Sequence, residues 1–95
     1  MREEFSRTEM ILGPEAVKKL EASKVAVFGI GGVGGHAAEA LVRSGVGSLT
    51  FVDYDRVTLS NLNRQIIALH STLGMYKVDA MKERALDINP RASID

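Results

Sequence analysis

The feature that most constrains this chain is a glycine-rich turn that directly follows a short apolar run. Residues 24–34 read Lys-Val-Ala-Val-Phe-Gly-Ile-Gly-Gly-Val-Gly, which places Gly29, Gly31 and Gly34 in the spacing GxGxxG. In this spacing the first glycine permits a tight turn, the second lets the backbone approach a phosphate, and the third lets a helix pack closely on its strand. The N–H groups and the dipole at the start of that helix attract an anion. The turn therefore predicts a site for the phosphates of a nucleotide.

The flanking sequence favours this interpretation over a purely structural turn. Residues 25–28 are apolar, which is typical of a parallel strand that is covered on both faces. After the turn, apolar residues recur at helical spacing, at Val33, Ala37, Ala40 and Leu41. A second strand over 48–52 leads into Asp53, 24 residues beyond Gly29. An acidic side chain about 20 residues after the first glycine is where a ribose hydroxyl would be held.

Length and composition limit the classes of protein that are compatible with the sequence. The 95 residues fit at most one small domain, and a nucleotide-binding sheet of this kind needs more strands, so we expect the N-terminal portion of a larger doubly wound domain. The 12 basic and 12 acidic residues balance, so net charge does not direct the chain to nucleic acid. The lack of cysteine excludes disulfides and thiolate metal sites here, and it fits a cytoplasmic location. No apolar run has the length of a transmembrane segment.

The order of the expected elements is that of an α/β protein. Residues 1–22 are expected to form a charged arm and a short helix that begins at Pro14. Residues 24–95 follow as a β-α-β-loop-α-β nucleotide-binding core. This alternation predicts one domain over residues 1–95, with a Rossmann-like parallel sheet and flanking helices.

The second half of this core contains a long loop and one further helix. The loop over 53–74 is polar and has no clean period, which is typical of a functional or mobile loop. The helix over 74–89 is stopped by Pro90, and a third strand begins at Ala92. The apolar stripe of this helix consists of Val78, Met81, Ala85 and Ile88.

A second motif indicates which kind of nucleotide is bound. Residues 53–65 read Asp-Tyr-Asp-Arg-Val-Thr-Leu-Ser-Asn-Leu-Asn-Arg-Gln. A nicotinamide cofactor needs little beyond the ribose acid, whereas a triphosphate needs cations, which Arg64 and Lys77 can supply at the carboxyl ends of the strands. Spacing alone leaves open whether Arg64 is a solvated loop arginine and Lys77 a surface lysine. A nicotinamide-dependent oxidoreductase and a non-catalytic nucleotide-binding module therefore stay as alternatives.

Taken together, these motifs resemble one family. The glycine turn, Asp53-Tyr-Asp55 and Ser60-Asn-Leu-Asn-Arg-Gln65 look like the adenylating family that contains ThiF, MoeB and the ubiquitin-activating enzymes. Arg7-Thr-Glu-Met-Ile-Leu-Gly13 resembles the N-terminal arm of that family, and Lys77-Val78 and Asp87-Ile-Asn-Pro90 match it in place. The resemblance covers nearly the whole chain.

The resemblance implies roles for individual residues. Asp53 would hold the ribose. Asp55 is counted with the nucleotide site; from its own chemistry it could bind a metal or cap the loop, and the structural role is favoured. Arg7 would act across a homodimer interface on the partner's ATP. The magnesium ligand of the family follows a later strand, so we expect no metal ligand within these 95 residues. Four glycines would line the ATP phosphates, namely Gly29, Gly31, Gly32 and Gly34. Three polar side chains would contact the triphosphate and stabilise its charge during catalysis, namely Asn61, Arg64 and Lys77.

The chemistry that the resemblance implies is ATP-dependent adenylation of a carboxylate, a ligase-like step. Residues 68–72, Ala-Leu-His-Ser-Thr, resemble the tRNA threonylcarbamoyladenosine dehydratases more than the sulfur-carrier adenylyltransferases. In the former, the activated carboxylate belongs to the modified tRNA and its attack by a neighbouring group closes a ring. In the latter, it is the C-terminus of a ubiquitin-like carrier protein, and a sulfur-relay partner is then implied. We expect the 95 residues alone to be inactive.

The two histidines do not change this interpretation. His36 follows the glycine turn, where we expect a structural or exposed side chain, and His70 in the loop is left open. Two isolated histidines without paired acids are a poor metal site, so no metal site is predicted within the chain.

Overall fold

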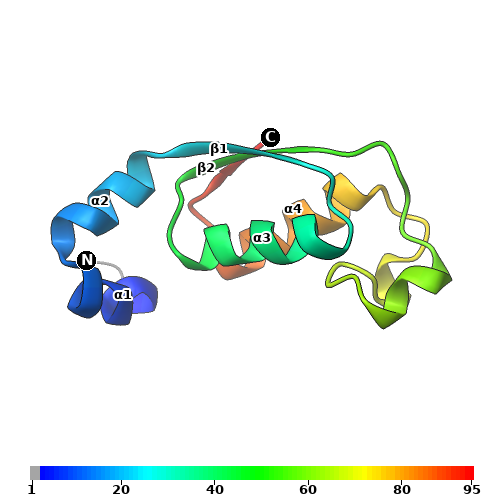
Figure 1. Cartoon of the computed structure of the whole chain (residues 1–95), viewed down its shortest axis with the longest axis horizontal. Coiled ribbons are helices and arrows are strands. Elements are labelled where there is room, and N and C mark those ends of the chain that lie inside the picture. The colour runs from blue at the N-terminus through cyan, green and yellow to red at the C-terminus, as the bar shows by residue number, and fades with distance from the viewer. Residues whose placement is uncertain (1–2) are drawn as a thin grey trace.

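The computed structural model describes residues 3–95 as a parallel sheet with helices on one face (Figure 1). Strands β1 (Lys24–Phe28), β2 (Ser48–Val52) and β3 (Ser93–Ile94) pair in the order β1-β2-β3. The predicted α/β fold with parallel strands is therefore confirmed. Arg2, at the start of the predicted charged arm, lies outside the described residues. Within residues 3–95, no helix has the length and apolarity needed to cross a membrane.

Two helices cover one face of the sheet and form the core with it. Helices α3 (Gly32–Arg43) and α4 (Lys77–Ile88) lie side by side under the strands (Figure 1). Leu49 and Phe51 of β2 point into this layer and are buried, because alternate side chains of a strand face opposite sides. The largest fully buried side chains are Ile30, Leu49, Ile67, Met81, Val42 and Val46.

The opposite face of the sheet is open, which corrects the expectation for the first strand. Along β1, Val25 and Val27 are half-buried, whereas Ala26 and Phe28 are exposed, Phe28 by 77%. Because β1 lies at the edge of the three strands, and both core helices pack on one side, its other face has no cover among residues 3–95. The apolar run therefore forms the predicted strand, but the strand is covered on one face only.

Helix α3 turns a different side to the core than its apolar spacing predicts. Val33, Ala37 and Ala40 are exposed, and Leu41 is half-buried, whereas the buried residues are Gly35, Ala38 and Val42. The cause is the close approach at the start of the helix. A Cβ built on Gly34 would lie 1.7 Å from the Gly29 carbonyl oxygen, so only glycine fits there. A Cβ built on Gly35 would lie 3.2 Å from the Ile30 carbonyl oxygen. The glycines therefore orient the helix.

The N-terminal segment contains the expected helix from Pro14, and the charged arm before it is helical as well. A short 3₁₀ turn (Glu3–Phe5) leads into α1 (Ser6–Leu12) and α2 (Pro14–Ala22), and α1 packs mainly on α2. Phe5 anchors the segment, because its buried ring lies against Gly45 at the end of α3. Figure 1 shows α1 at the end of the molecule opposite the loop that follows β2.

The loop after β2 contains more structure than the sequence suggested. It forms two 3₁₀ turns, η2 (Leu59–Asn63) and η3 (His70–Thr72), and it buries Val57, Ile67 and Ala68 in the core. An antiparallel bridge between Arg56 and Tyr76 delays the start of α4 to Lys77. The predicted apolar stripe of α4 is confirmed. Met81 and Ala85 are buried, and Val78 and Ile88 are half-buried.

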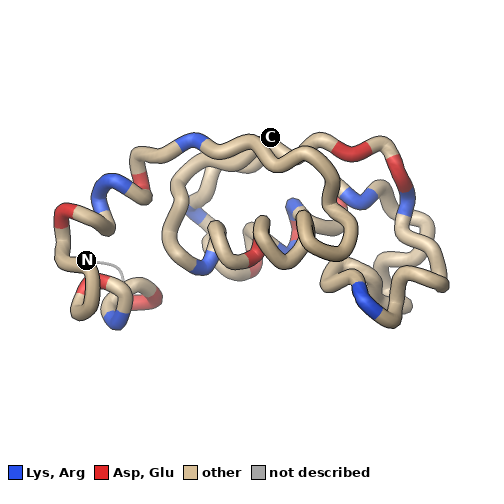
Figure 2. Tube along the Cα trace, in the orientation of Figure 1, with Lys and Arg blue, Asp and Glu red and all other residues tan. Residues whose placement is uncertain are grey.

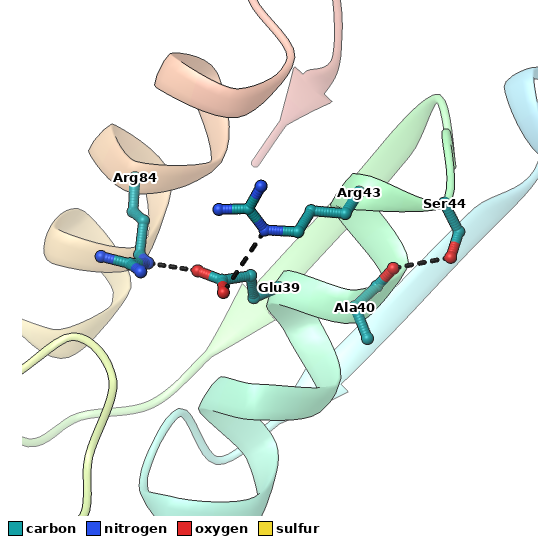
Figure 3. Close-up of polar contacts among 5 residues, drawn as sticks. All are labelled: Glu39, Ala40, Arg43, Ser44 and Arg84. Atoms are coloured by element: carbon teal, nitrogen blue, oxygen red, sulfur yellow. Dashed lines mark hydrogen bonds and ion pairs between the residues drawn. The ribbon is translucent and has the colours of Figure 1, made fainter. Parts of the chain in front are cut away.

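An ion-pair network joins the two core helices (Figure 3). Glu39 of α3 accepts a hydrogen bond from Arg84 of α4 and pairs with Arg43 one turn further along α3. Burial raises the pKa of the Glu39 carboxyl, but the hydrogen bond and charge of Arg84, aided by Arg43, outweigh this and hold the pKa below its ordinary value of 4.5. The network therefore favours the charged form of Glu39.

Candidate functional site

The glycine turn has the geometry that its spacing predicts. Gly29 has a φ of 88°, a conformation that favours glycine, and its N–H donates to the Val52 carbonyl at 2.8 Å. The predicted tight turn and the close helix packing at Gly34 are both confirmed. Helix α3 starts from Gly31 without a side-chain cap, so its first N–H groups have no such partner within the described part of the chain. These N–H groups lie where the sequence predicts that an anion binds.

Asp53 is tied to this turn by its carboxylate. Its Oδ2 accepts the Ile30 N–H at 2.7 Å, and its Oδ1 accepts the Asp55 N–H at 2.8 Å. Each carboxylate oxygen keeps a further lone pair, so the half-buried group can still accept hydroxyl donors. The turn and the end of β2 are therefore joined by hydrogen bonds to one carboxylate.

Lys77 is not the surface lysine that the spacing left open. It is the first residue of α4 and is only 7% exposed. Its backbone N–H donates to the Asp55 carbonyl at 2.9 Å, which connects the start of α4 to the segment hydrogen-bonded to Asp53. The structure thus links the glycine turn, Asp53, Asp55 and Lys77 through consecutive contacts.

Asn61 and Arg64 lie on the 3₁₀ turn of the loop. The buried Asn61 accepts the Thr58 N–H on its Oδ1 at 2.9 Å and leaves its amide N–H groups to donate elsewhere. Arg64 is exposed, and its Nη1 donates to the Ser60 carbonyl at 3.2 Å and to Asn63 Oδ1 at 2.9 Å. Figure 2 shows acidic and basic residues along the segment after β2, at the end of the molecule opposite α1.

Gln65 is a site candidate that sequence reasoning did not single out. Its side chain is 8% exposed, and its Nε2 lies 3.5 Å from the place that a Cβ on Gly31 would occupy. Its Oε1 is the buried side-chain atom without a hydrogen-bond partner in the described residues, which is costly. The sequence feature that could have identified Gln65 is its place at the end of the second motif. Only the fold reveals that its side chain lies beside Gly31.

The remaining candidates do not join this group. Arg7 lies on α1, at the other end of the molecule, so the structure does not bring it to the glycine turn of its own chain (Figure 1). His36 on α3 and His70 on η3 are exposed. In residues 3–95, no group of three or more His, Asp or Glu side chains could hold a metal ion.

One surface hollow lies away from this group. A hollow of about 450 Å³ is lined by Glu4, Phe5, Arg43, Arg84, Asp87 and Ile88, near the N-terminal segment. None of the predicted site residues lines it. The glycine turn stays the predicted site, because the positive φ of Gly29, the uncapped N–H groups and the Asp53 carboxylate meet there.

Comparison with known proteins gives a consistent result. The profile of the ThiF family matches residues 5–95. A tRNA threonylcarbamoyladenosine dehydratase of Bacillus subtilis is 53% identical over 94 residues, which are 99% of this chain and 37% of that protein. A molybdopterin-synthase adenylyltransferase of Haemophilus influenzae is 44% identical over 78 residues, which are 82% of this chain and 32% of that protein.

Solved structures agree with this. Two crystal structures of the Escherichia coli tRNA threonylcarbamoyladenosine dehydratase, one in complex with AMP and one with ATP, each superpose with a TM-score of 0.96 at 42% identity. Each comparison covers 98% of this chain and 38% of the other. The chain therefore spans little more than a third of the length of these relatives. With a family profile over residues 5–95 and a relative that is 53% identical over 99% of this chain, the chain belongs to the ThiF family.

Proposed function

We propose that this chain carries the ATP-binding part of an enzyme that adenylates a carboxylate, and that the carboxylate belongs to threonylcarbamoyladenosine in tRNA. The observation that carries the proposal is the 2.7 Å bond between the Ile30 N–H and Asp53 Oδ2, which places an acidic side chain beside the uncapped helix start. A ribose and its phosphates need these two features next to each other. The 53% identity to the B. subtilis dehydratase favours the tRNA substrate.

Each described residue receives a role in this proposal. The turn formed by Gly29, Gly31, Gly32 and Gly34 lines the phosphates with backbone N–H groups, and Asp53 accepts the ribose hydroxyls. Asp55 supports the site through its backbone contacts with Asp53 and Lys77. Asn61, Arg64 and Lys77 donate to the triphosphate, where the ammonium of Lys77, on a residue that is only 7% exposed, stabilises developing charge.

The chemistry then needs little covalent participation by the protein. A carboxylate oxygen attacks the α-phosphorus of ATP, the bond to the leaving oxygen breaks, and pyrophosphate departs. The acyl-adenylate is an activated carbonyl, so attack by a group of the same modified nucleoside closes a ring and releases AMP. Positioning and charge stabilisation are sufficient for such a reaction. A tRNA substrate is in keeping with a cytoplasmic reaction.

Arg7 takes part only in a homodimer in this proposal. It lies on α1, away from the glycine turn of its own chain, so it acts on the ATP of the partner subunit. Magnesium is proposed to accompany ATP, because this ion is usually bound through substrate phosphates and one or two carboxylates. The described residues do not form a metal cage, and no step above runs through the ion.

The test is AMP release from ATP by the full-length protein, with threonylcarbamoyl-modified tRNA and separately with a ubiquitin-like protein that ends in Gly-Gly. AMP release with the tRNA, together with a product nucleoside that is lighter by one water, supports the proposal. Hydride transfer from a nicotinamide cofactor without any ATP use would overturn it.

A second candidate is activation of a sulfur-carrier protein. The 44% identity to the molybdopterin-synthase adenylyltransferase of H. influenzae favours it, and the ATP site would be the same. In that case AMP or acyl-adenylate forms only with the carrier protein, and a sulfur-relay protein is the further partner. The lower identity and coverage make it the weaker candidate.

A further inference from the structure

Lys77 is held in place by the chain around it rather than by a partner for its charge. Within the described residues, no hydrogen bond or ion pair reaches its ammonium group, although the residue is 7% exposed. A lysine side chain is flexible, and no partner among residues 3–95 fixes the charged end of this one, so the position of the charge depends on the backbone that carries the side chain. The elements that fix the start of α4 therefore control where this charge lies.

A short backbone ladder provides the first part of this support. The segment after β2 and the segment before α4 run antiparallel, with Arg56 opposite Tyr76. Three bonds join them: Lys77 N–H to the Asp55 carbonyl at 2.9 Å, Val57 N–H to the Met75 carbonyl at 2.8 Å, and Gly74 N–H to the Val57 carbonyl at 3.0 Å. Such a short pairing is marginal without side-chain support.

The side chain of Arg56 supplies that support. Its Cζ lies 4.0 Å from the centre of the Tyr76 ring, and its Nη1 donates to the Gly74 carbonyl at 2.9 Å. One guanidinium thus contacts the glycine at the turn, whose φ is 85°, and the aromatic residue directly before Lys77. A planar guanidinium can stack on a ring and donate in its plane at once, whereas the ammonium of lysine cannot.

We propose that Arg56 and Tyr76 are positioning residues that fix the ammonium of Lys77 at the nucleotide site. This rests on the proposed function in one respect, namely that Lys77 contacts the triphosphate. Arg56 itself touches no substrate. Its effect on ATP use passes through the stacked ring and the ladder to the first turn of α4.

The test is a double-mutant cycle in the full-length protein, read as kcat and KM for ATP in AMP formation. Arg56→Ala is expected to lower kcat/KM about fivefold, with a similar loss for Arg56→Lys and Tyr76→Leu, whereas Tyr76→Phe keeps the ring and stays within about twofold of wild type. In a Lys77→Ala background, Arg56→Ala should change the remaining activity less than about twofold, because the residue it positions is absent. Arg91→Ala, which removes another exposed arginine outside the ladder, serves as the matched control.

The outcomes separate this proposal from the proposed function. Full activity in Arg56→Ala or Arg56→Lys overturns the positioning role and leaves the ATP site intact. The same holds if the double variant loses activity by the product of the two single losses, those of Arg56→Ala and Lys77→Ala. Unchanged ATP use in Lys77→Ala overturns the role of Lys77 in the proposed function, and the positioning role with it. Melting temperatures of each variant show whether any loss reflects unfolding.

Discussion

The two ends of the molecule hold their residues in different ways. At the carboxyl ends of the strands, Asp53 accepts two backbone N–H groups and Lys77 is buried at the start of α4. At the other end, α1 exposes Met10 by 84% and Ile11 by 83%, and it packs mainly on α2. The site-bearing end obtains its geometry from contacts within the chain, whereas the apolar side of α1 has no cover among residues 3–95. Substitutions within one subunit test the first end, and mixed subunits test the second.

The largest effect is expected at the closest backbone contact of the site-bearing end. In Gly34→Ala, the new Cβ would lie 1.7 Å from the Gly29 carbonyl oxygen, so turn and helix must separate, and we expect a loss of more than about 4 kcal/mol in the free energy of unfolding. Chemical denaturation measures it. Gly32→Ala is the control on the same helix, because its Cβ would meet no atom within 4 Å, and its stability should stay within about 1 kcal/mol. Equal stabilities of the two variants would contradict the packing account.

The next effect concerns catalysis at the same end. Lys77→Ala removes the ammonium proposed to contact the triphosphate, and kcat/KM for ATP-dependent AMP formation should fall about 100-fold to 1,000-fold. Steady-state kinetics with the full-length protein measure this loss. Lys82→Ala, on the exposed side of the same helix, should retain activity. Equal activity in Lys77→Ala and Lys82→Ala would show that Lys77 has no role in catalysis.

A mixing experiment tests whether Arg7 at one end acts on the site at the other end of the partner subunit. Arg7→Ala and Arg64→Ala subunits should each be inactive alone, because each lacks one of the proposed ATP contacts. If Arg7 acts on the partner's site, random mixing gives one intact site in half of the dimers, so activity should recover to about a quarter of wild type. Activity after exchange of subunits is the measurement. A mixture no more active than its components would place Arg7 outside the site.

The smallest effect is expected between the two ends, at Glu39. Its pKa is lowered in the folded protein, so the network stabilises the fold fully above the unfolded-state pKa and loses this contribution as the pH falls through the lower folded-state pKa. Below about pH 4.5 wild type should therefore lose its advantage over Glu39→Gln, an advantage of less than about 1 kcal/mol because Arg84 and Arg43 both remain partly exposed. Denaturation at several pH values tests the sign. An advantage that grows on acidification would contradict it.

Local sequence signals predicted much of the site-bearing end. The glycines indicate where the backbone needs a positive φ or a close approach, so the turn at Gly29 was predicted correctly. The short apolar runs indicate the strands, so strand β2 was predicted correctly as well. The family resemblance depends on the same residues, and the comparisons confirm it. The contact of Asp53 with the Ile30 N–H follows from the two strands being neighbours.

Other features depend on contacts that no local pattern contains. The buried side of α3 is chosen by the approach of Gly34 to the strand rather than by the spacing of Val33 and Ala37. The burial of Lys77 arises from a bridge between residues on either side of a long loop. Gln65 is polar and gave no periodic signal, so only the fold revealed its side chain against Gly31.

The most direct test of the central claim follows the oxygen atoms of the reaction. Threonylcarbamoyl-modified tRNA would be prepared with heavy oxygen in its carboxylate and given to the full-length protein with ordinary ATP. If a carboxylate oxygen attacks the α-phosphorus, that oxygen leaves with AMP when the ring closes, so mass spectrometry should find AMP with one heavy oxygen. Unlabelled AMP formed alongside the cyclised nucleoside would show that the carboxylate is not adenylated, and it would contradict the account.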